Sequence, residues 1–517
     1  MIAPCFATLS LVLLQDPSTD AATLELSLRD CVYVVLRRNL DLQIVDVGNQ
    51  STATSIDSAH GAFDPELFVS ALGSEEEVPT ASSFIAPSNQ RLTSRAGLRG
   101  LGQTGLSYDL SYDFGYQRQS PSNPFFGLNP TYSSVVTLNL AQPLLRGGGT
   151  EVNTAEMTRG RFLVERGNFD KYFQVQQTTF AAVEAYWNYV FTLRNLDTAK
   201  EALEVARELV HNNERKLEAG VMTRLDVTQA KAEEKRRDEA LITAQNEVGR
   251  AEDALRLLLY PGDGLQGWQQ RIVPTTEPRI EELELKPEQE MVDTAFARRS
   301  DLKAVEADLG IADLDIMVAE NTTRPQLDLS GSYGLAGLSG KTATERHSNG
   351  NHWEESLESI RASEFESWSV GLDFSYPIGN ETARAGLRRA EWEKERARLV
   401  WLKLRTQIVQ ELRGALRDVT DGRASVEAAR QSRILAEDQF EAQKIRLDNQ
   451  HATTFEVREA QRDLFEARDS ETQAVVNYMM SIANLFLAQG ILAEQFGEIF
   501  EDETREEGAL WTPSVEE

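Results

Sequence analysis

The sequence predicts an α+β protein in which one architecture, strands followed by a very long helical hairpin, is built twice. One observation is an echo between Lys216–Ala230 and Arg446–Ala460, in which Thr223 matches Thr453. A second is a stretch from about residue 152 to 212 that contains no proline. The third is strand-like alternation ahead of the long helices in both halves. A long internal repeat decides the whole fold, so it is considered before any local motif.

The repeat covers nearly the whole chain. Its further echoes are RRNLDL at Arg37–Leu42 with ARRSDL at Ala297–Leu302, Pro65 with Pro325, and SVVTLNLAQPL from Ser134 with SVGLDFSYPI from Ser369. We therefore expect a first repeat at residues 24–260 and a second at 287–490. Residues 261–286, which contain Gly and Pro, are expected to link them.

The first repeat is expected to begin with a helix over 24–60, followed by strands within 63–141. Leu106–Tyr116 alternates apolar or aromatic residues with small or polar ones, and Tyr132–Ala141 places Val136, Leu138 and Leu140 on one face. Polar loops are expected at 75–90 and 117–131. This alternation is typical of transmembrane barrel strands, and a soluble β-domain is the plainer alternative.

Residues 152–259 are predicted to form a helical hairpin. A helix of about 60 residues is roughly 90 Å long, which is deeper than a globular core, so it must lie beside other helices. The returning helix carries a heptad seam, the pattern of knobs-into-holes packing. The seam residues are Leu241, Ala244, Val248, Ala251, Leu255 and Leu258. A plain coiled-coil scaffold would also explain the helices.

The second repeat is expected to contain strands within 326–376, a polar loop at 339–366 and a helical hairpin at 381–489. Its seam residues are Val457, Ala460, Leu464, Ala467, Ala474, Tyr478 and Leu485. Residues 491–517 are expected to form an acidic C-terminal tail, of which Glu501–Glu517 is expected to be disordered.

Composition excludes several classes of protein. The net charge is −29, whereas a nucleic-acid-binding face is basic. Cys5 and Cys31 are the only cysteines, which excludes a disulfide framework and a cysteine zinc site. The five histidines are scattered, and no nucleophile–base pair or nucleotide motif is found. We therefore predict no catalytic residues, no cofactor and no metal.

The N-terminus, residues 1–22, resembles a secretion signal, because its apolar run of about ten residues is too short to span a bilayer. It lacks Lys and Arg, and an ordinary buried segment is the alternative. No other apolar run reaches spanning length. If the chain crosses a membrane, it must do so as a closed β-barrel.

Two groups of polar residues merit a functional interpretation. His347 and His352 share a predicted loop with Glu354 and Glu355, where a metal is one interpretation and solvated polar side chains are the plainer one. Glu456 and Glu459, three residues apart, share a helix face. In an isolated chain that face is simply solvated, but copies arranged around an axis would turn the carboxylates into rings.

Taken together, these segments resemble the TolC family of trimeric outer-membrane channel proteins. The resemblance covers about residues 24–492 and rests on the order and double occurrence of its motifs. They are QPLLRGGG and SYPIGN at the strand-to-helix junctions, RPQLDLSGSY, AGVMTRLDVTQA at the first turn, FEVREAQRDLFEA after the second, and ANLFLAQGIL at the end of the last helix.

The resemblance implies a homotrimer in the outer membrane. Each subunit would give four strands to a twelve-stranded barrel embedded in lipid, and its helices would form a twelve-helix barrel across the periplasm. The helix tips would dock on a periplasmic adaptor that is linked to an inner-membrane pump. Such a protein is a passive duct and not an enzyme. The sequence does not identify the cargo or the class of pump, and a scaffold without a pore remains the alternative.

The resemblance also implies roles for residues at the two tips. Gly220, Val221, Met222 and Thr223, with Thr453 in the second tip, would contact the adaptor. Glu456 and Glu459 would ring the periplasmic entrance, and Asp226 would hydrogen-bond or latch at the first tip.

Three departures from the family pattern are visible. Gln450 stands where a tip glycine is usual, and Ala452 where some relatives have a basic latch residue, for which Arg224 is a possible substitute. Phe63–Tyr116 contains more strand material than two strands need. The extra hairpin belongs either at the barrel rim or in a wider barrel.

Overall fold

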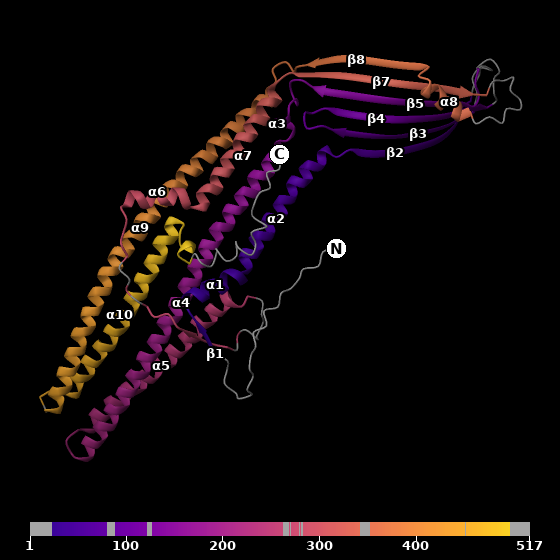
Figure 1. Ribbon diagram of the computed structural model, residues 1–517. Coiled ribbons are helices and arrows are strands. Elements are labelled where there is room, and N and C mark those ends of the chain that lie inside the picture. The colour runs from indigo at the N-terminus through magenta and orange to yellow at the C-terminus, as the bar shows by residue number, and fades with distance from the viewer. Residues whose placement is uncertain are drawn as a thin grey trace. The chain divides into compact units, whose positions relative to one another are not determined.

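A computed structural model describes residues 23–79, 88–120, 127–261, 268, 270–278, 280, 283–341, 352–449 and 451–496 (Figure 1). The predicted signal segment, His347, Gln450 and most of the predicted tail lie outside these residues. The chain divides into two compact units. Unit 1 comprises Met1–Ile44, Lys171–Ser300 and Thr406–Glu517, and unit 2 comprises Val45–Asp170 and Asp301–Arg405. Each predicted repeat therefore contributes to both units.

The helices follow the predicted order. They are α1 (Leu28–Arg38), α2 (Leu40–His60), α3 (Thr150–Asn153), α4 (Ala155–Glu218), α5 (Arg224–Leu259), α6 (Glu288–Arg298), α7 (Ser300–Thr323), α8 (His352–Arg361), α9 (Glu381–Asp448) and α10 (Thr454–Gln489). Within the described residues, none of them combines the length and apolar character needed to cross a bilayer.

Unit 1 contains a core built around aromatic side chains of α4. Tyr186, Trp187 and Tyr189 are at most 2% exposed. Strand β1 (Thr23–Leu26) pairs in parallel with β6 (Arg271–Pro274), which lies in the predicted linker. The Tyr186 and Tyr189 hydroxyls donate to the carbonyls of Leu26 and Ile272, so both buried phenols are satisfied. Burial in the same core raises the pKa of the Cys31 thiol to about 12.

A second core of unit 1 comes from the second repeat. Leu412, Ala415 and Val419 of α9 pack with Met291 of α6 and Tyr478 of α10. The first core also takes Val476, Ala483 and Leu492 from the end of the second repeat, so the two repeats share one core and the second repeat has another of its own. Arg299, at the end of α6, is 8% exposed and donates to the Glu411 carboxylate at 2.6 Å and to the Ala488 carbonyl.

The predicted seam of α10 is buried in unit 1 and that of α5 is buried in part, with Leu241 and Val248 half-buried. Helix α5 lies alongside α4, and α10 alongside α9 (Figure 1). All seven predicted seam residues of α10 are buried. In α5, Ala244, Ala251 and Leu255 are buried as predicted, but Leu259 at 1% exposure takes the place predicted for Leu258. A 3.6-residue helical repeat drifts against a strict heptad, so the buried position shifts by one residue towards the helix end.

Unit 2 contains a six-stranded antiparallel sheet in the order β2-β3-β4-β5-β7-β8. The strands are β2 (Glu66–Glu77), β3 (Ser88–Leu101), β4 (Ser107–Ser120), β5 (Thr131–Pro143), β7 (Gln326–Gly340) and β8 (Phe365–Ser375). The four strands per subunit implied by the resemblance are therefore wrong for this sheet. The surplus strand material of the first repeat pairs into the same sheet as the rest.

The register gives this sheet one apolar and one polar face. Direct partners in an antiparallel pair share a face, so Tyr108 lies with Leu140, and Leu110 with Leu138, as the alternation predicted. The apolar face is formed by Leu67, Val69, Leu98, Tyr108, Leu110, Val136, Leu138, Leu329, Tyr333, Trp368, Val370, Leu372 and Phe374. The polar face carries Glu66, Ser70, Arg95, Arg99, Asp109, Asp113, Thr137, Asp328, Ser369 and Asp373.

Helix α8 corrects the prediction of a loop over 339–366. Its Ser356 is fully buried, and the Ser356 and Ser134 hydroxyls lie 2.8 Å apart. His352 stacks on Tyr132 with ring centroids 6.3 Å apart. Trp353, Leu357 and Ile360 recur at helical spacing, so a helical period is present in this polar segment, and contacts with β5 and β7 hold the helix in place.

Candidate functional site

The first tip joins α4 to α5, and its shape depends on Gly220. This residue has a φ of 76°, in the left-handed region. The Gly220 N–H donates to the Leu217 carbonyl at 2.9 Å, and the Val221 N–H donates to the Lys216 carbonyl at 2.9 Å, which is the Schellman pattern. A Cβ on Gly220 would meet no atom within 4 Å, so backbone conformation alone favours glycine here.

The first turn of α5 is closed by a reciprocal capping box. The Asp226 N–H donates to the Thr223 hydroxyl oxygen at 3.4 Å, and the Thr223 N–H donates to the Asp226 carboxylate at 3.0 Å. The Thr223 hydroxyl also donates to that carboxylate at 2.6 Å. These bonds satisfy backbone N–H groups that a helix start leaves without partners. Asp226 thus forms hydrogen bonds within the first tip, and its role at the entrance stays a prediction.

The second tip, between α9 and α10, repeats this arrangement. The Glu456 N–H donates to the Thr453 hydroxyl at 3.3 Å, and the Thr453 N–H donates to Glu456 at 2.6 Å. The His451 N–H donates to the Arg446 carbonyl at 2.7 Å, as Val221 does to Lys216 in the first tip. The echo between the two turns is therefore structural. The pattern Thr-x-x-Asp/Glu is the sequence signal of both capping boxes.

Hydrogen bonds at the tips favour the charged forms of the Asp226 and Glu456 carboxyls. Hydrogen bonds from the Thr223 hydroxyl and N–H lower the pKa of the Asp226 carboxyl below its usual range. Those from the Thr453 N–H and hydroxyl do the same for the pKa of Glu456, and the charge of Arg446 adds a smaller contribution. Glu459 pairs with Arg462, one turn along α10. The entrance role of Glu456 and Glu459 stays a prediction.

Exposed apolar side chains surround both turns. Val221 is 71% exposed and Leu225 is 65% exposed at the first tip, while Met222 is half-buried. Phe455 of the second tip is exposed, and the Arg458 guanidinium lies 5.1 Å from its ring centroid. Beneath them, Val227, Ala230, Val457 and Ala460 are buried and anchor the turns. This is a rigid support beneath an exposed apolar end.

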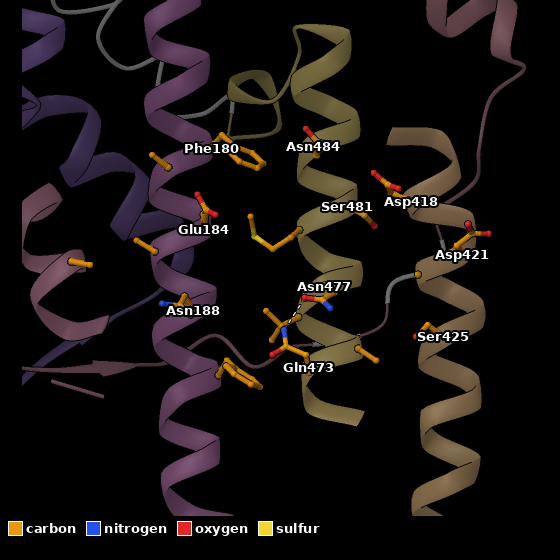
Figure 2. A pocket seen from close by; sticks show the side chains of 18 residues that line it. Phe180, Glu184, Asn188, Asp418, Asp421, Ser425, Gln473, Asn477, Ser481 and Asn484 are labelled. Atoms are coloured by element: carbon orange, nitrogen blue, oxygen red, sulfur yellow. Dashed lines mark hydrogen bonds between the residues drawn. The ribbon is translucent and has the colours of Figure 1, made fainter. Parts of the chain in front are cut away.

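An open groove of about 1060 Å³ in unit 1 is lined mainly by α4, α9 and α10 (Figure 2). Glu184 and Asn188 come from α4, Asp418 and Asp421 from α9, and Asn477 and Ser481 from α10. Gly422 lets α9 approach α10 here, because a Cβ would lie 3.3 Å from the Tyr478 ring. The groove is polar and acidic, and sequence reasoning did not single out its residues.

The predicted histidine loop brings no metal site together in the described residues. His352 lies in α8, 6% exposed, with its Nδ1 3.1 Å from a Glu355 carboxylate oxygen. Nowhere in the described ranges do three or more His, Cys, Asp or Glu side chains gather as a metal site would require. The other member of the predicted pair, His347, lies outside those ranges.

Comparison with known families gives one match that covers both halves. The family described as "Outer membrane efflux protein" matches residues 106–259 and 291–490. Outer membrane protein TolC of Escherichia coli (strain K12) is 22% identical over 405 residues, which is 76% of this chain and 76% of that protein. Outer membrane protein TolC of Vibrio cholerae serotype O1 is 23% identical over 366 residues, 69% of this chain and 77% of that protein.

Solved structures share the fold. The outer-membrane channel OprN aligns with a TM-score of 0.65 at 19% identity, covering 90% of this chain and 89% of OprN. The CmeC outer membrane channel of Campylobacter jejuni aligns with a TM-score of 0.63 at 17% identity, covering 92% of this chain and 89% of CmeC. The fold is therefore that of outer-membrane channels.

Proposed function

The chain belongs to the outer membrane efflux protein family, and we propose that it is the outer-membrane duct of a tripartite efflux or secretion system. In this proposal it is a homotrimer that conducts cargo passively from the periplasm to the exterior, while an inner-membrane pump supplies the energy. The family match over both repeats is the observation that carries the proposal. The protein acts on no bond of its cargo.

The two-faced sheet supports a membrane role for unit 2. A transmembrane β-strand needs about 9–11 residues, and the six strands have 11 to 15. Large side chains on the apolar face of β8 are open to solvent, with Trp368 75% and Phe374 67% exposed. Patches of this kind mark contact with another protein or with lipid. A coiled-coil scaffold has no use for such a sheet, so the duct is favoured.

The tips support a docking role for unit 1. Val221 and Leu225 project from a turn that the Gly220 conformation and the Thr223 capping box hold rigid. A rigid support lowers the entropy lost when a partner binds. The partner in this proposal is a periplasmic adaptor whose contact surface has apolar pockets for these side chains. Thr453 and Phe455 give the second tip a related surface.

The tip carboxylates support a cation-favouring entrance. Three copies of Glu456 and Glu459 would place six carboxylates around one axis. The capping bond holds Glu456 in its charged form, so it contributes a fixed negative charge. Salt screens exposed charges over about 8–10 Å. The ring therefore selects by charge and does not hold the entrance shut, and helix packing is left to close it.

The proposal is tested by subunit counting in membrane fractions. Outer and inner membranes are separated, the protein is extracted in mild detergent, and its subunits are cross-linked at increasing reagent concentration. We expect recovery with the outer membrane and a cross-linked ladder that stops at three. A water-soluble, monodisperse monomer would remove the basis of the proposal.

A further inference from the structure

The sheet of unit 2 has two open edges, β2 and β8. Among the described residues, β2 pairs only with β3, and β8 only with β7. Alternate residues of a strand direct their N–H and C=O groups to opposite sides, so the 12 residues of β2 leave about six without a ladder partner. Neither strand contains proline within its bounds, and no bulge interrupts its register. Such an edge is a template for another strand.

The two edges are matched in direction. Every neighbouring pair in the sheet is antiparallel, so the strand direction reverses five times from β2 to β8. Strands β2 and β8 therefore run in opposite directions. The β8 edge of one copy can continue, antiparallel, into the β2 edge of the next. This contact joins different surfaces head to tail, the kind of interface that closes into a ring.

The two edges are also matched in chemistry. In its first half β2 exposes Leu67 at 76% and Val69 at 75% on the apolar face, whereas Glu75 and Glu77 lie on that face at its other end; β8 exposes Val370 at 69% and Leu372 at 63% on the same face. The opposite sides carry Ser70 on β2 and Ser369 on β8. When residues of the apolar face of β8 pair with residues of the apolar face of β2 in the next copy, both faces of the sheet continue from one copy into the next. A slip of one residue would place leucines among the polar residues.

Strands β3 and β4 are fastened into the sheet between β2 and β5. On the polar face the Arg99 guanidinium donates to Glu66 of β2 at 2.8 Å, and Arg95 donates to Asp109 of β4 at 3.0 Å. The Phe68 ring lies opposite Gly97 of β3, under both arginines, with centroid distances of 5.6 Å to Arg95 and 5.3 Å to Arg99.

On the apolar face, an aromatic side chain likewise connects β3 with β4. The Tyr108 ring of β4 lies opposite Gly100 of β3, where a Cβ would come within 2.4 Å of the phenolic oxygen. An aromatic ring over a cross-strand glycine fixes register and fills the space that the glycine leaves. The family match begins at residue 106, so β2 and β3 lie outside it.

We propose that the channel wall takes six strands from each copy, with β3 and β4 inside it, and that β8 of one copy pairs with β2 of the next. This inference rests on the proposed trimer. Three copies close at eighteen strands instead of the twelve expected from the family resemblance. Barrel diameter grows roughly in proportion to strand number, so this wall is about half again as wide, and natural barrels of 16–18 strands leave an aqueous channel.

Disulfide trapping across the joint tests the proposal. Cys5 is replaced by Ser, and the fully buried Cys31 is left in place, because burial keeps it unreactive. Ser70→Cys is combined in turn with Ser367→Cys, Ser369→Cys and Ser375→Cys, all on the polar face of β8. Mild oxidation is applied to outer membranes. We expect at least one pair to give a covalent trimer on a denaturing, non-reducing gel, while each single variant gives monomer.

A second set of pairs tests whether β3 and β4 belong to the wall. Ser70→Cys is combined with Ser133→Cys or Thr137→Cys of β5. Three strand spacings, about 14 Å in all, separate β2 from β5 in the six-strand wall, so no bond forms and both thiols remain available to a maleimide reagent. A twelve-strand wall without β3 and β4 would bring β2 beside β5, and these pairs would oxidise within one chain. A twelve-strand wall without β2 and β3, the strands outside the family match, would leave Ser70→Cys untrapped by every β8 position.

The outcomes separate this inference from the proposed function. Trimers trapped through β8 without a β2–β5 bond support the eighteen-strand wall. The eighteen-strand wall is contradicted by a β2–β5 bond, or by isolated trimers in which no β8 cysteine forms a bond with Ser70→Cys. Neither result contradicts the proposed duct. Protein that is monomeric before any oxidation contradicts the trimer itself, and with it both proposals.

Discussion

The conformation of Gly220 makes a quantitative prediction for Gly220→Ala. The φ of 76° puts a Cβ close to the neighbouring carbonyl oxygen, which costs about 1–2 kcal/mol, and the lower entropy of the unfolded alanine chain offsets part of this. No packing energy enters, because no atom lies within 4 Å of that Cβ. We therefore expect the free energy of opening the first tip to fall by about 1 kcal/mol, roughly fivefold in the opening equilibrium.

Gly249→Ala is the matched control. Gly249 lies inside α5, is exposed, and likewise has no atom within 4 Å of an added Cβ. Because its backbone is helical, the same substitution should stabilise that helix by about 0.5–1 kcal/mol. One chemical change is thus predicted to have opposite signs at two exposed sites. Gly220→Asn should cost less than Gly220→Ala, since asparagine tolerates the left-handed region.

Amide hydrogen exchange measured by mass spectrometry on the detergent-extracted protein reports both changes. Peptides that contain Val221, whose N–H donates to the Lys216 carbonyl, should exchange about fivefold faster in Gly220→Ala. Peptides around Gly249 should exchange more slowly in Gly249→Ala. Unchanged or slower exchange at the tip in Gly220→Ala would refute the argument from backbone conformation.

Three further predictions concern the tips. Val221→Asp should abolish efflux in cells while trimer yield stays normal, and Val221→Ile should retain efflux; full efflux in Val221→Asp would argue against docking at this residue. Glu456→Gln with Glu459→Gln should lower the cation selectivity of single channels. The control pair on α5, Glu239→Gln with Glu247→Gln, should leave it unchanged. Equal selectivity in the two double variants would place the α10 glutamates away from the pore. Glutamine can still close the capping box, so the tip should remain folded. Folding lowers the pKa values of Asp226 and Glu456. Their contribution to the stability of the folded tips is therefore present above the ordinary carboxyl pKa of about 4, and it is lost as pH falls through the folded pKa values. Amide exchange is intrinsically slower in acid, so rates are compared with those of the unfolded peptide at each pH. On that scale the protection of both tips should fall as pH is lowered through the folded pKa values, and a Thr223→Val, Thr453→Val variant should lack most of this pH dependence.

The helices were predictable because their signals are periodic and local. Val457, Ala460 and Leu464 follow a heptad, and all three are buried. Gly220 marked the first turn, and its positive φ confirms the reason given for glycine there. The alternation of Tyr108 and Leu110 fixed a face of the sheet, which the pairing with Leu140 and Leu138 confirms.

Other features depend on contacts between distant residues. Ser356 is buried because Ser134, 222 positions earlier, faces it, and nothing in the polar segment around α8 predicts that contact. The number of strands in the sheet was similarly open: the sequence offered enough strand material, but only the register of β3 with β2 and β4 places the additional strands. The groove beside Glu184 also needs three helices to be brought together.

The candidate site divides in the same way. The sequence identified the residues of both tips, and the structure shows Thr223 with Asp226, and Thr453 with Glu456, as equivalent capping pairs. Which side of α10 faces a pore depends on neighbouring copies, and no feature of a single chain decides it. The roles of Glu456 and Glu459 therefore follow from the proposed assembly.

Single-channel recording tests the central claim most directly. Purified, cross-link-verified trimer is added to a planar lipid bilayer under a fixed voltage. A duct through the trimer predicts discrete, uniform current steps, one for each inserted trimer, with more cations than anions carried. Trimers that insert into the bilayer without any current step would contradict the account and restore the scaffold without a pore.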